Sequence, residues 1–201
     1  MIELFDCPFS GNAYKCRLMM HKLGLAYTRT VVDLDAGATR TPGFLARNPN
    51  GRVPLLGLPD GTHIAESNAI LCWLAKGTPW LPDDRLEFAR VMQWMFFEQY
   101  SHEPNIATVR HWLTHGIEIT PLRAQLIEMK RPQGHAALGV MESHLATRPF
   151  FLGTRPTVAD IALYAYTHVA EEGGFALAPY PSVRAWLDRV AADAPHMLIT
   201  D

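Results

Sequence analysis

Residues 9–18 read FSGNAYKCRL, from Phe9 to Leu18, and they join a short β-prone run to the start of a helix. The β-prone run covers residues 2–5, and a polar and proline-containing stretch stops it. Ser10 is a favourable N-cap, and apolar side chains recur at helical spacing over residues 13–23. Gly24 then ends the helix as a left-handed C′ residue would. We therefore expect a strand, a tight junction at Ser10 and a helix.

The junction at Ser10 has a chemical consequence. The first backbone N–H groups of a helix have no partner within it, and the positive end of the helix dipole points the same way. A thiolate placed there is stabilised, because a helix N-terminus lowers a thiol pKa from its free value of roughly 8.5. Ser10 could donate a hydrogen bond to such a thiolate, and Asn12 could donate a second. The alternative from these residues alone is that Ser10 only caps the helix.

Two further segments indicate a peptide ligand. Asn48-Pro49-Asn50-Gly51-Arg52-Val53-Pro54 ends at a strand start, where the backbone amide and carbonyl of Val53 could pair with an extended peptide. Glu66 and Ser67 stand at another helix start. There Ser67 could hold a ligand carboxylate and Glu66 an ammonium group. Together with Ser10, these segments describe a site for a zwitterionic peptide that carries a thiol.

The order of elements indicates two domains. Up to residue 77 the pattern is β-α-β-α-β-β-α, with a hairpin turn at Pro59-Asp60-Gly61. Residues 78–84 contain two prolines and are typical of a linker. Residues 85–201 lose the β signals. We expect helices there over residues 86 to about 106, with Pro104 kinking the far part, over 122 to about 145, after Thr157 and around 183–190.

Composition excludes several function classes. The 201 residues carry a formal net charge of -2 and a pI near 6.5, which is no basis for nucleic-acid binding. The N-terminus has no signal-peptide pattern, and no run of about 18 apolar residues occurs. The three cysteines and nine histidines have no metal-ligand spacing. We expect a cytoplasmic protein with reduced thiols, without a metal, nucleic-acid or membrane partner.

Four motifs in order make the chain resemble the cytosolic glutathione transferase family over nearly its whole length. They are Ser10-x-Asn12-x-x-Lys15-x-Arg17-Leu18, Asn48-Pro49-x-Gly51-x-Val53-Pro54, Glu66-Ser67-x-Ala69-Ile70 and Pro156-Thr157-Val158-Ala159-Asp160. The serine version most resembles the theta-like bacterial members. The resemblance implies an α/β thioredoxin-like N-terminal domain, an all-α C-terminal domain, assembly as a homodimer and a role in detoxification.

The resemblance also implies residue roles. Ser10 and Asn12 would act on the thiol of glutathione, which is the co-substrate. The residues that would hold the rest of glutathione are Arg40, Arg52, Val53, Pro54, Glu66 and Ser67, with a cis bond before Pro54. Tyr100 and Arg110 would line the pocket for the electrophile. Thr157 has Asp160 three residues further on, which predicts a capping-box-like helix start. Both residues match a family folding motif, and we interpret them as structural.

The implied reaction is conjugation of the glutathione thiolate to a small electrophile. Two alternatives stay open: a glutathione-dependent disulfide oxidoreductase, and a non-catalytic protein of the same fold that binds ligands or proteins. Cys7-Pro8-Phe9-Ser10 looks like a monothiol version of the glutaredoxin site. Counting back from Arg17-Leu18, however, puts the catalytic position on Ser10, so we expect Cys7 to be inert.

Overall fold

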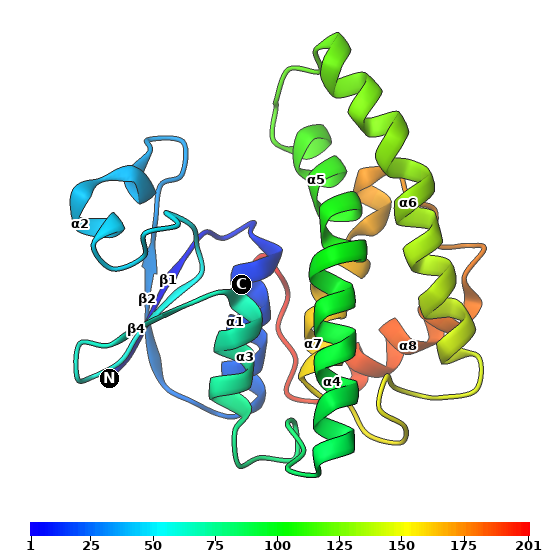
Figure 1. Ribbon diagram of the computed structural model, residues 1–201, viewed down its shortest axis with the longest axis horizontal. Coiled ribbons are helices and arrows are strands. Elements are labelled where there is room, and N and C mark those ends of the chain that lie inside the picture. Colours follow the sequence, from blue (N-terminus) through cyan, green and yellow to red (C-terminus); the bar gives the residue numbers. More distant parts are fainter. The chain divides into compact units, whose positions relative to one another are not determined.

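The computed structural model describes all residues from Met1 to Asp201 and divides into two compact units. Unit 1 contains Met1–Thr78 together with Ala194–Asp201, and unit 2 contains Pro79–Asp193 (Figure 1). The sequence pattern places the C-terminal residues in the helical domain. In the structure, residues 194–201 instead belong to the thioredoxin-like unit.

Unit 1 has the predicted element order. Its elements are β1 (Ile2–Asp6), α1 (Gly11–Lys22), β2 (Tyr27–Val31), the 3₁₀ turn η1 (Ala38–Arg40), α2 (Pro42–Leu45), β3 (Leu55–Gly57), β4 (His63–Ala65) and α3 (Ser67–Ala75). The sheet order is β2-β1-β3-β4, with β1 parallel to β2 and the other pairs antiparallel. This mixed sheet is the thioredoxin-like arrangement that the family resemblance implies. The predicted left-handed Gly24 after α1 is also confirmed, with φ of 64°.

Both faces of the sheet are covered. Neighbouring strand residues point to opposite faces, and Phe5 and Leu55 pack with Phe44 of α2 on one of them. Leu4 and Leu56, which pair across β1 and β3, therefore face the other side, where α1 and α3 lie against each other (Figure 1). This packing fixes the start of α1 beside the start of α3.

The C-terminal residues join unit 1 through backbone carbonyls. The Arg17 side chain is fully buried, its Nε lies 3.3 Å from Asp6 Oδ2, and its Nη2 donates to the carbonyls of Pro8 (2.8 Å) and Ile199 (2.9 Å). The Tyr14 hydroxyl donates to the Met197 carbonyl at 2.7 Å. One guanidinium thus connects the C-terminal segment to the loop that precedes Ser10.

Unit 2 is all-helical, as predicted. Its elements are α4 (Arg85–Phe97), the π-helical turn η2 (Glu98–His102), α5 (Glu103–Thr114), α6 (Pro121–Leu145), α7 (Val158–Thr167), the 3₁₀ turn η3 (Ala170–Gly173) and α8 (Pro181–Ala192). The first predicted helix is interrupted by η2 just before Pro104. Pro104 then stands in the first turn of α5, where a missing N–H is tolerated.

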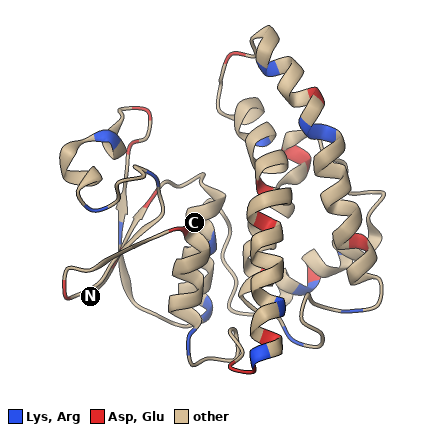
Figure 2. Ribbon diagram, viewed as in Figure 1, with Lys and Arg blue, Asp and Glu red and all other residues tan.

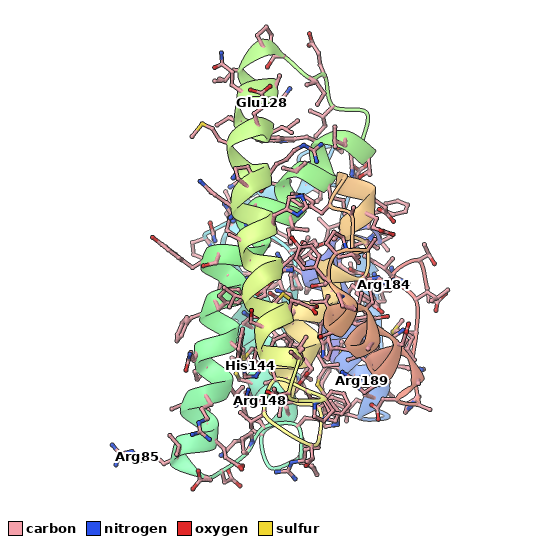
Figure 3. The ribbon with its side chains drawn as sticks, turned by 90° about the vertical axis from the view of Figure 1, so that its right-hand side faces the viewer. Arg85, Glu128, His144, Arg148, Arg184 and Arg189 are labelled. Atoms are coloured by element: carbon pink, nitrogen blue, oxygen red, sulfur yellow. The ribbon has the colours of Figure 1, made fainter.

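Side chains from two helices hold the loop that follows α6. His144 Nε2 contacts the Phe151 carbonyl at 3.0 Å, and Arg189 Nε donates to the Pro149 carbonyl at 3.0 Å. Figure 3 shows His144 near the end of α6 and Arg189 on α8. These bonds fix the segment that leads into the start of α7.

The distribution of charged residues in unit 2 fits the small net charge of the chain. Acidic and basic residues are interspersed over the helices of unit 2, without a large region of one sign (Figure 2). None of the helices combines the length and the apolar character that a membrane span requires.

Candidate functional site

The start of α1 is built by Ser10. Its backbone is extended (φ -75°, ψ 115°), and its Oγ accepts a hydrogen bond from Ala13 N at 3.2 Å. Its own N–H donates to the Cys7 carbonyl at 2.9 Å, which tightens the loop before the helix. Because Oγ uses a lone pair for Ala13, its O–H can still donate to a ligand. The capping role and the ligand role are therefore compatible.

The start of α3 holds a strained residue. Glu66 has φ of 70° and ψ of 114°, and it is the only residue other than glycine with a positive φ. Such a backbone costs on the order of 1 to 3 kcal/mol and persists where the surroundings impose it, often at binding sites. The Glu66 carboxylate is exposed, and Asn50 Nδ2 donates to its Oε1 at 3.4 Å. The chain thus presents this carboxylate at the surface.

A hydrogen-bonded junction joins the two helix starts. The Ser67 hydroxyl donates to Asn12 Oδ1 at 3.1 Å, and Lys15 Nζ lies 3.4 Å from Ser67 Oγ and 3.5 Å from Asn68 Oδ1. The structure therefore brings Asn12 and Ser67 together, with Ser10 two residues from Asn12. From the sequence, Asn12 is expected only to donate to a thiolate, whereas in the structure its Oδ1 accepts from Ser67. The contacts of Lys15 are not expected from the sequence.

The segment before β3 completes this side of unit 1. The bond between Val53 and Pro54 is cis, as the family resemblance implies. Asn48 Nδ2 donates to the Arg52 carbonyl at 2.8 Å, and Arg40 Nη1 donates to the Asn50 carbonyl at 3.2 Å. Both arginines are exposed, Val53 is half-buried and Pro54 is buried.

Gly51 allows the close approach of Arg40. Its φ is 60°, and a Cβ there would stand 2.6 Å from Arg40 Nη1. A side chain at residue 51 would therefore displace the guanidinium that spans this loop. The Arg40 guanidinium is therefore held against the backbone of the segment before β3.

Cys7 lies directly after β1, in the loop that leads to Ser10 and α1, and its thiol is not activated. Burial raises the pKa of the Cys7 thiol, and the neighbouring Asp6 carboxylate raises it further, against the opposing effect of hydrogen bonds from Phe9 and Ser10. A nucleophilic cysteine needs a lowered pKa. The surroundings of Cys7 agree with the expectation that it is inert.

The two predicted pocket residues lie in unit 2 and do not share a cavity. Tyr100 is 87% exposed on η2 and borders a hollow of about 330 Å³ between η2, α5 and α6. Arg110 is buried on α5, where its Nε pairs with Glu172 Oε2 at 2.7 Å, and it is not among the residues lining that hollow. Its guanidinium therefore connects α5 to η3. No group of three or more His, Cys, Asp or Glu side chains is arranged to hold a metal ion.

Comparison with known protein families matches both units. Residues 7–76 match the family described as glutathione S-transferase, N-terminal domain. Residues 124–189 match the family described as glutathione S-transferase, C-terminal domain. The first match contains the junction between α1 and α3, and the second contains the start of α7.

Two curated relatives are similar along most of their length. The chain is 33% identical to maleylacetoacetate isomerase of Rhizobium meliloti (strain 1021), with 94% of this chain and 90% of the relative covered. It is 28% identical to disulfide-bond oxidoreductase YfcG of Escherichia coli (strain K12), with the same coverage of 94% and 90%. Relatives of this fold thus carry names that describe different reactions.

Solved structures agree with these matches. A glutathione S-transferase from Pseudomonas fluorescens [Pf-5] is 46% identical, with a TM-score of 0.96 over 100% of this chain and 99% of that one. A glutathione transferase from Burkholderia graminis, solved with two glutathione molecules bound per subunit, is 26% identical, with a TM-score of 0.84 over 96% and 84%. The sequence matches and the shared fold together show that the chain belongs to the cytosolic glutathione S-transferase family.

Proposed function

We propose that this chain is an enzyme that binds glutathione at the starts of α1 and α3, ionises its thiol beside Ser10 and transfers the thiolate to a small electrophile. The observation that carries the proposal is the junction in which Ser67 donates to Asn12 at 3.1 Å. It holds two helix N-termini together, and each is suited to one anionic group. Glutathione has a thiolate and a γ-glutamyl carboxylate to offer them.

The chemical step needs little from the protein beyond charge stabilisation and positioning. The thiol gives its proton to solvent, and the Ser10 O–H donates to the sulfur anion that remains. The sulfur electron pair then forms a bond to the electrophilic carbon, and the leaving group departs with the electrons of the bond that breaks. Holding the two reactants together lowers the entropic part of the barrier.

The rest of glutathione would be held by backbone and charge. Val53, beside the cis bond to Pro54, offers its amide and carbonyl to the cysteinyl residue. Glu66 takes the α-ammonium group, and the N-terminus of α3 at Ser67 takes the α-carboxylate. Arg40 and Arg52 are exposed on the same unit and suit the glycyl carboxylate.

Finer assignments follow from the same proposal. The serine at the start of α1 supports a serine-type, theta-like assignment. We also propose a homodimer in the cytoplasm with a detoxifying role, and an electrophile pocket to which Tyr100 contributes. The buried ion pair of Arg110 with Glu172 favours a supporting role for that residue.

The second candidate is a glutathione-dependent disulfide oxidoreductase. The similarity to a disulfide-bond oxidoreductase favours it, and the same Ser10 site would serve. In that reaction the thiolate attacks a disulfide sulfur, forms a mixed disulfide and releases the other sulfur as a thiolate. The raised pKa of Cys7 argues against a direct part for that residue.

Steady-state kinetics of the purified protein test the proposal. Glutathione is supplied with an aromatic halide, an epoxide or a small disulfide, and the three rates are compared. We expect turnover with a carbon electrophile and an unchanged rate in Cys7→Ser. Turnover with the disulfide alone would establish the second candidate. Glutathione binding without turnover of any of the three would point to a non-catalytic carrier.

A further inference from the structure

Two histidines lie next to each other at the end of α5. Residues 111–115 read HWLTH, so His111 and His115 stand four positions apart. His111 is in the last turn of α5, and His115 is its C-cap residue, whose N–H donates to the His111 carbonyl at 3.2 Å. Residues four apart in a helix lie on the same face. From the sequence no metal-ligand spacing is expected among the histidines, and this pair corrects that expectation.

The geometry of the pair suits a shared metal ion. Both side chains are exposed, and their ring centroids are 4.4 Å apart, with an angle of 48° between the ring planes. Two imidazole nitrogens that bind one ion at roughly 2.0–2.1 Å lie about 3 Å from each other, which rings this close can reach. Two histidines at this spacing on a helix are also the pair that binds zinc in helical metal motifs. The negative end of the helix dipole lies at the same place and favours a cation there.

Thr114 determines which nitrogen of His115 carries the proton. The Thr114 hydroxyl gives its single hydrogen to the Arg110 carbonyl at 2.9 Å. Thr114 Oγ1 also lies 2.8 Å from His115 Nδ1, so this oxygen accepts there and Nδ1 carries a hydrogen. In the neutral ring, the lone pair that can bind a metal is therefore on Nε2. Metal-binding histidines are oriented by hydrogen bonds of this kind from their second ring nitrogen.

We propose that His111 and His115 form a two-histidine site for a divalent transition-metal ion, Cu²⁺, Ni²⁺ or Zn²⁺, with Thr114 as a positioning residue. Imidazole suits these ions, and the Irving–Williams order ranks Cu²⁺ above the other two. The ion joins the last turn of α5 to its C-cap residue, and water fills the remaining coordination positions. The site needs no glutathione, and all three residues belong to unit 2.

Calorimetric titration with Ni²⁺ and with Zn²⁺, in the absence of glutathione, tests the site. These two ions are used so that the three thiols of the chain are not oxidised during the titration. Burial raises the pKa of all three thiols, which disfavours their thiolates as competing ligands.

We expect the wild type to bind one ion at this site. His111→Asn and His115→Asn should each lose about a hundredfold in affinity, because a second imidazole no longer binds intramolecularly. His21→Asn is the matched control, because His21 is an exposed histidine of α1 with no histidine four residues away. It should bind the ion as tightly as the wild type.

The role of Thr114 has its own readout. Thr114→Val removes the acceptor for His115 Nδ1 and should weaken metal binding by about tenfold. Imidazole ¹⁵N NMR should show the proton on Nδ1 of His115 in the wild type and a mixture of tautomers in the valine variant. Thr114→Ser restores the hydroxyl and should restore both the affinity and the tautomer. Unchanged affinity in Thr114→Val would remove this residue from the site.

The other outcomes overturn the proposal in distinguishable ways. Two ions in the wild type, with one lost in each single variant and no change in affinity, would show two separate histidines. An equal loss in His21→Asn, or no loss in either variant of the pair, would place the metal elsewhere. The bound ion should also raise the melting temperature, since the helix brings the pair together only in the folded chain. An unchanged melting temperature with the ion bound would contradict a site built by the end of α5.

Discussion

Helices α3 and α7 both begin with a polar pair, and the two starts differ in where their polar groups point. At α7, Thr157 and Asp160 are fully buried. Asp160 accepts hydrogen bonds from Thr157 N (2.8 Å), Phe151 N (3.1 Å) and Trp186 Nε1 (3.0 Å). At α3, the Glu66 carboxylate is exposed on a strained backbone.

The difference separates a helix start that supports folding from one suited to binding. The capping box at Thr157 satisfies donors of its own chain, as the sequence predicts. At α3 the fold accepts an unfavourable φ at Glu66 and keeps a carboxylate at the surface, which is typical of a ligand site. Substitutions at the first start should therefore change stability, and substitutions at the second should change affinity.

The largest effect is expected at α7. Asp160→Ala leaves buried donors of Thr157, Phe151 and Trp186 without an acceptor, and each such loss costs about 1 to 3 kcal/mol. We expect the free energy of unfolding, measured by urea denaturation, to fall by about 3 to 5 kcal/mol. Asp188→Ala, at an exposed position of α8, is the control. A loss below about 1 kcal/mol would remove the capping box from its structural role.

The next effect is expected at α3, where two variants separate charge from strain. Glu66→Gln and Glu66→Gly both remove the carboxylate, so both should weaken glutathione binding by about 2 kcal/mol in calorimetry. Only the glycine variant also relieves the positive φ, so it should unfold at a higher temperature than the wild type. Intact affinity together with a lowered melting temperature would make Glu66 only a helix-start residue.

The third effect concerns pH, and it is small per pH unit. Burial raises the pKa of Asp160 to about 6, against about 3.9 in an unfolded chain. Between these values the folded state binds the proton more tightly, so this carboxyl contributes a stability that falls as pH rises from about 4 to about 6. The slope is at most on the order of 1 kcal/mol per pH unit.

Asp160→Asn cannot titrate and provides the reference for that pH effect. We measure the unfolding free energy of both proteins by urea denaturation. The value for the wild type minus the value for Asp160→Asn should fall as the pH rises from about 4 to about 6. A difference that grows in favour of the wild type would contradict the raised pKa of Asp160.

Features that depend on neighbouring residues in the sequence could be predicted. The N-cap at Ser10, the left-handed Gly24 and the capping box at Thr157 each depend on residue type and spacing within one turn, and all three are confirmed. The order of elements along unit 1 and the helical nature of unit 2 follow from periodicity and turn residues in the same way. Helix ends and turns have local chemical signatures.

Features that depend on tertiary packing could not be predicted. The contact between Lys15 and Ser67 exists only because α1 and α3 pack together, and the sequence separates the two residues widely. The C-terminal segment is held by the carbonyls of Met197 and Ile199, and backbone carbonyls are the same in every residue type. The π-helical turn before Pro104 likewise has no pattern of its own.

The most direct measurement is the pKa of the glutathione thiol in its complexes with the wild type and with Ser10→Ala, followed by ultraviolet absorbance of the thiolate. In the wild type, we expect a pKa below the roughly 8.5 of a free thiol. Loss of the Ser10 hydrogen bond to a charged sulfur, worth about 1.5 to 3 kcal/mol, should raise that pKa by about one to two units. Glutathione affinity should change much less, since Val53, Glu66 and the start of α3 hold the rest of the peptide. A bound thiol with the same pKa in both proteins would contradict the assignment of Ser10 and of the α1 start as the thiolate site.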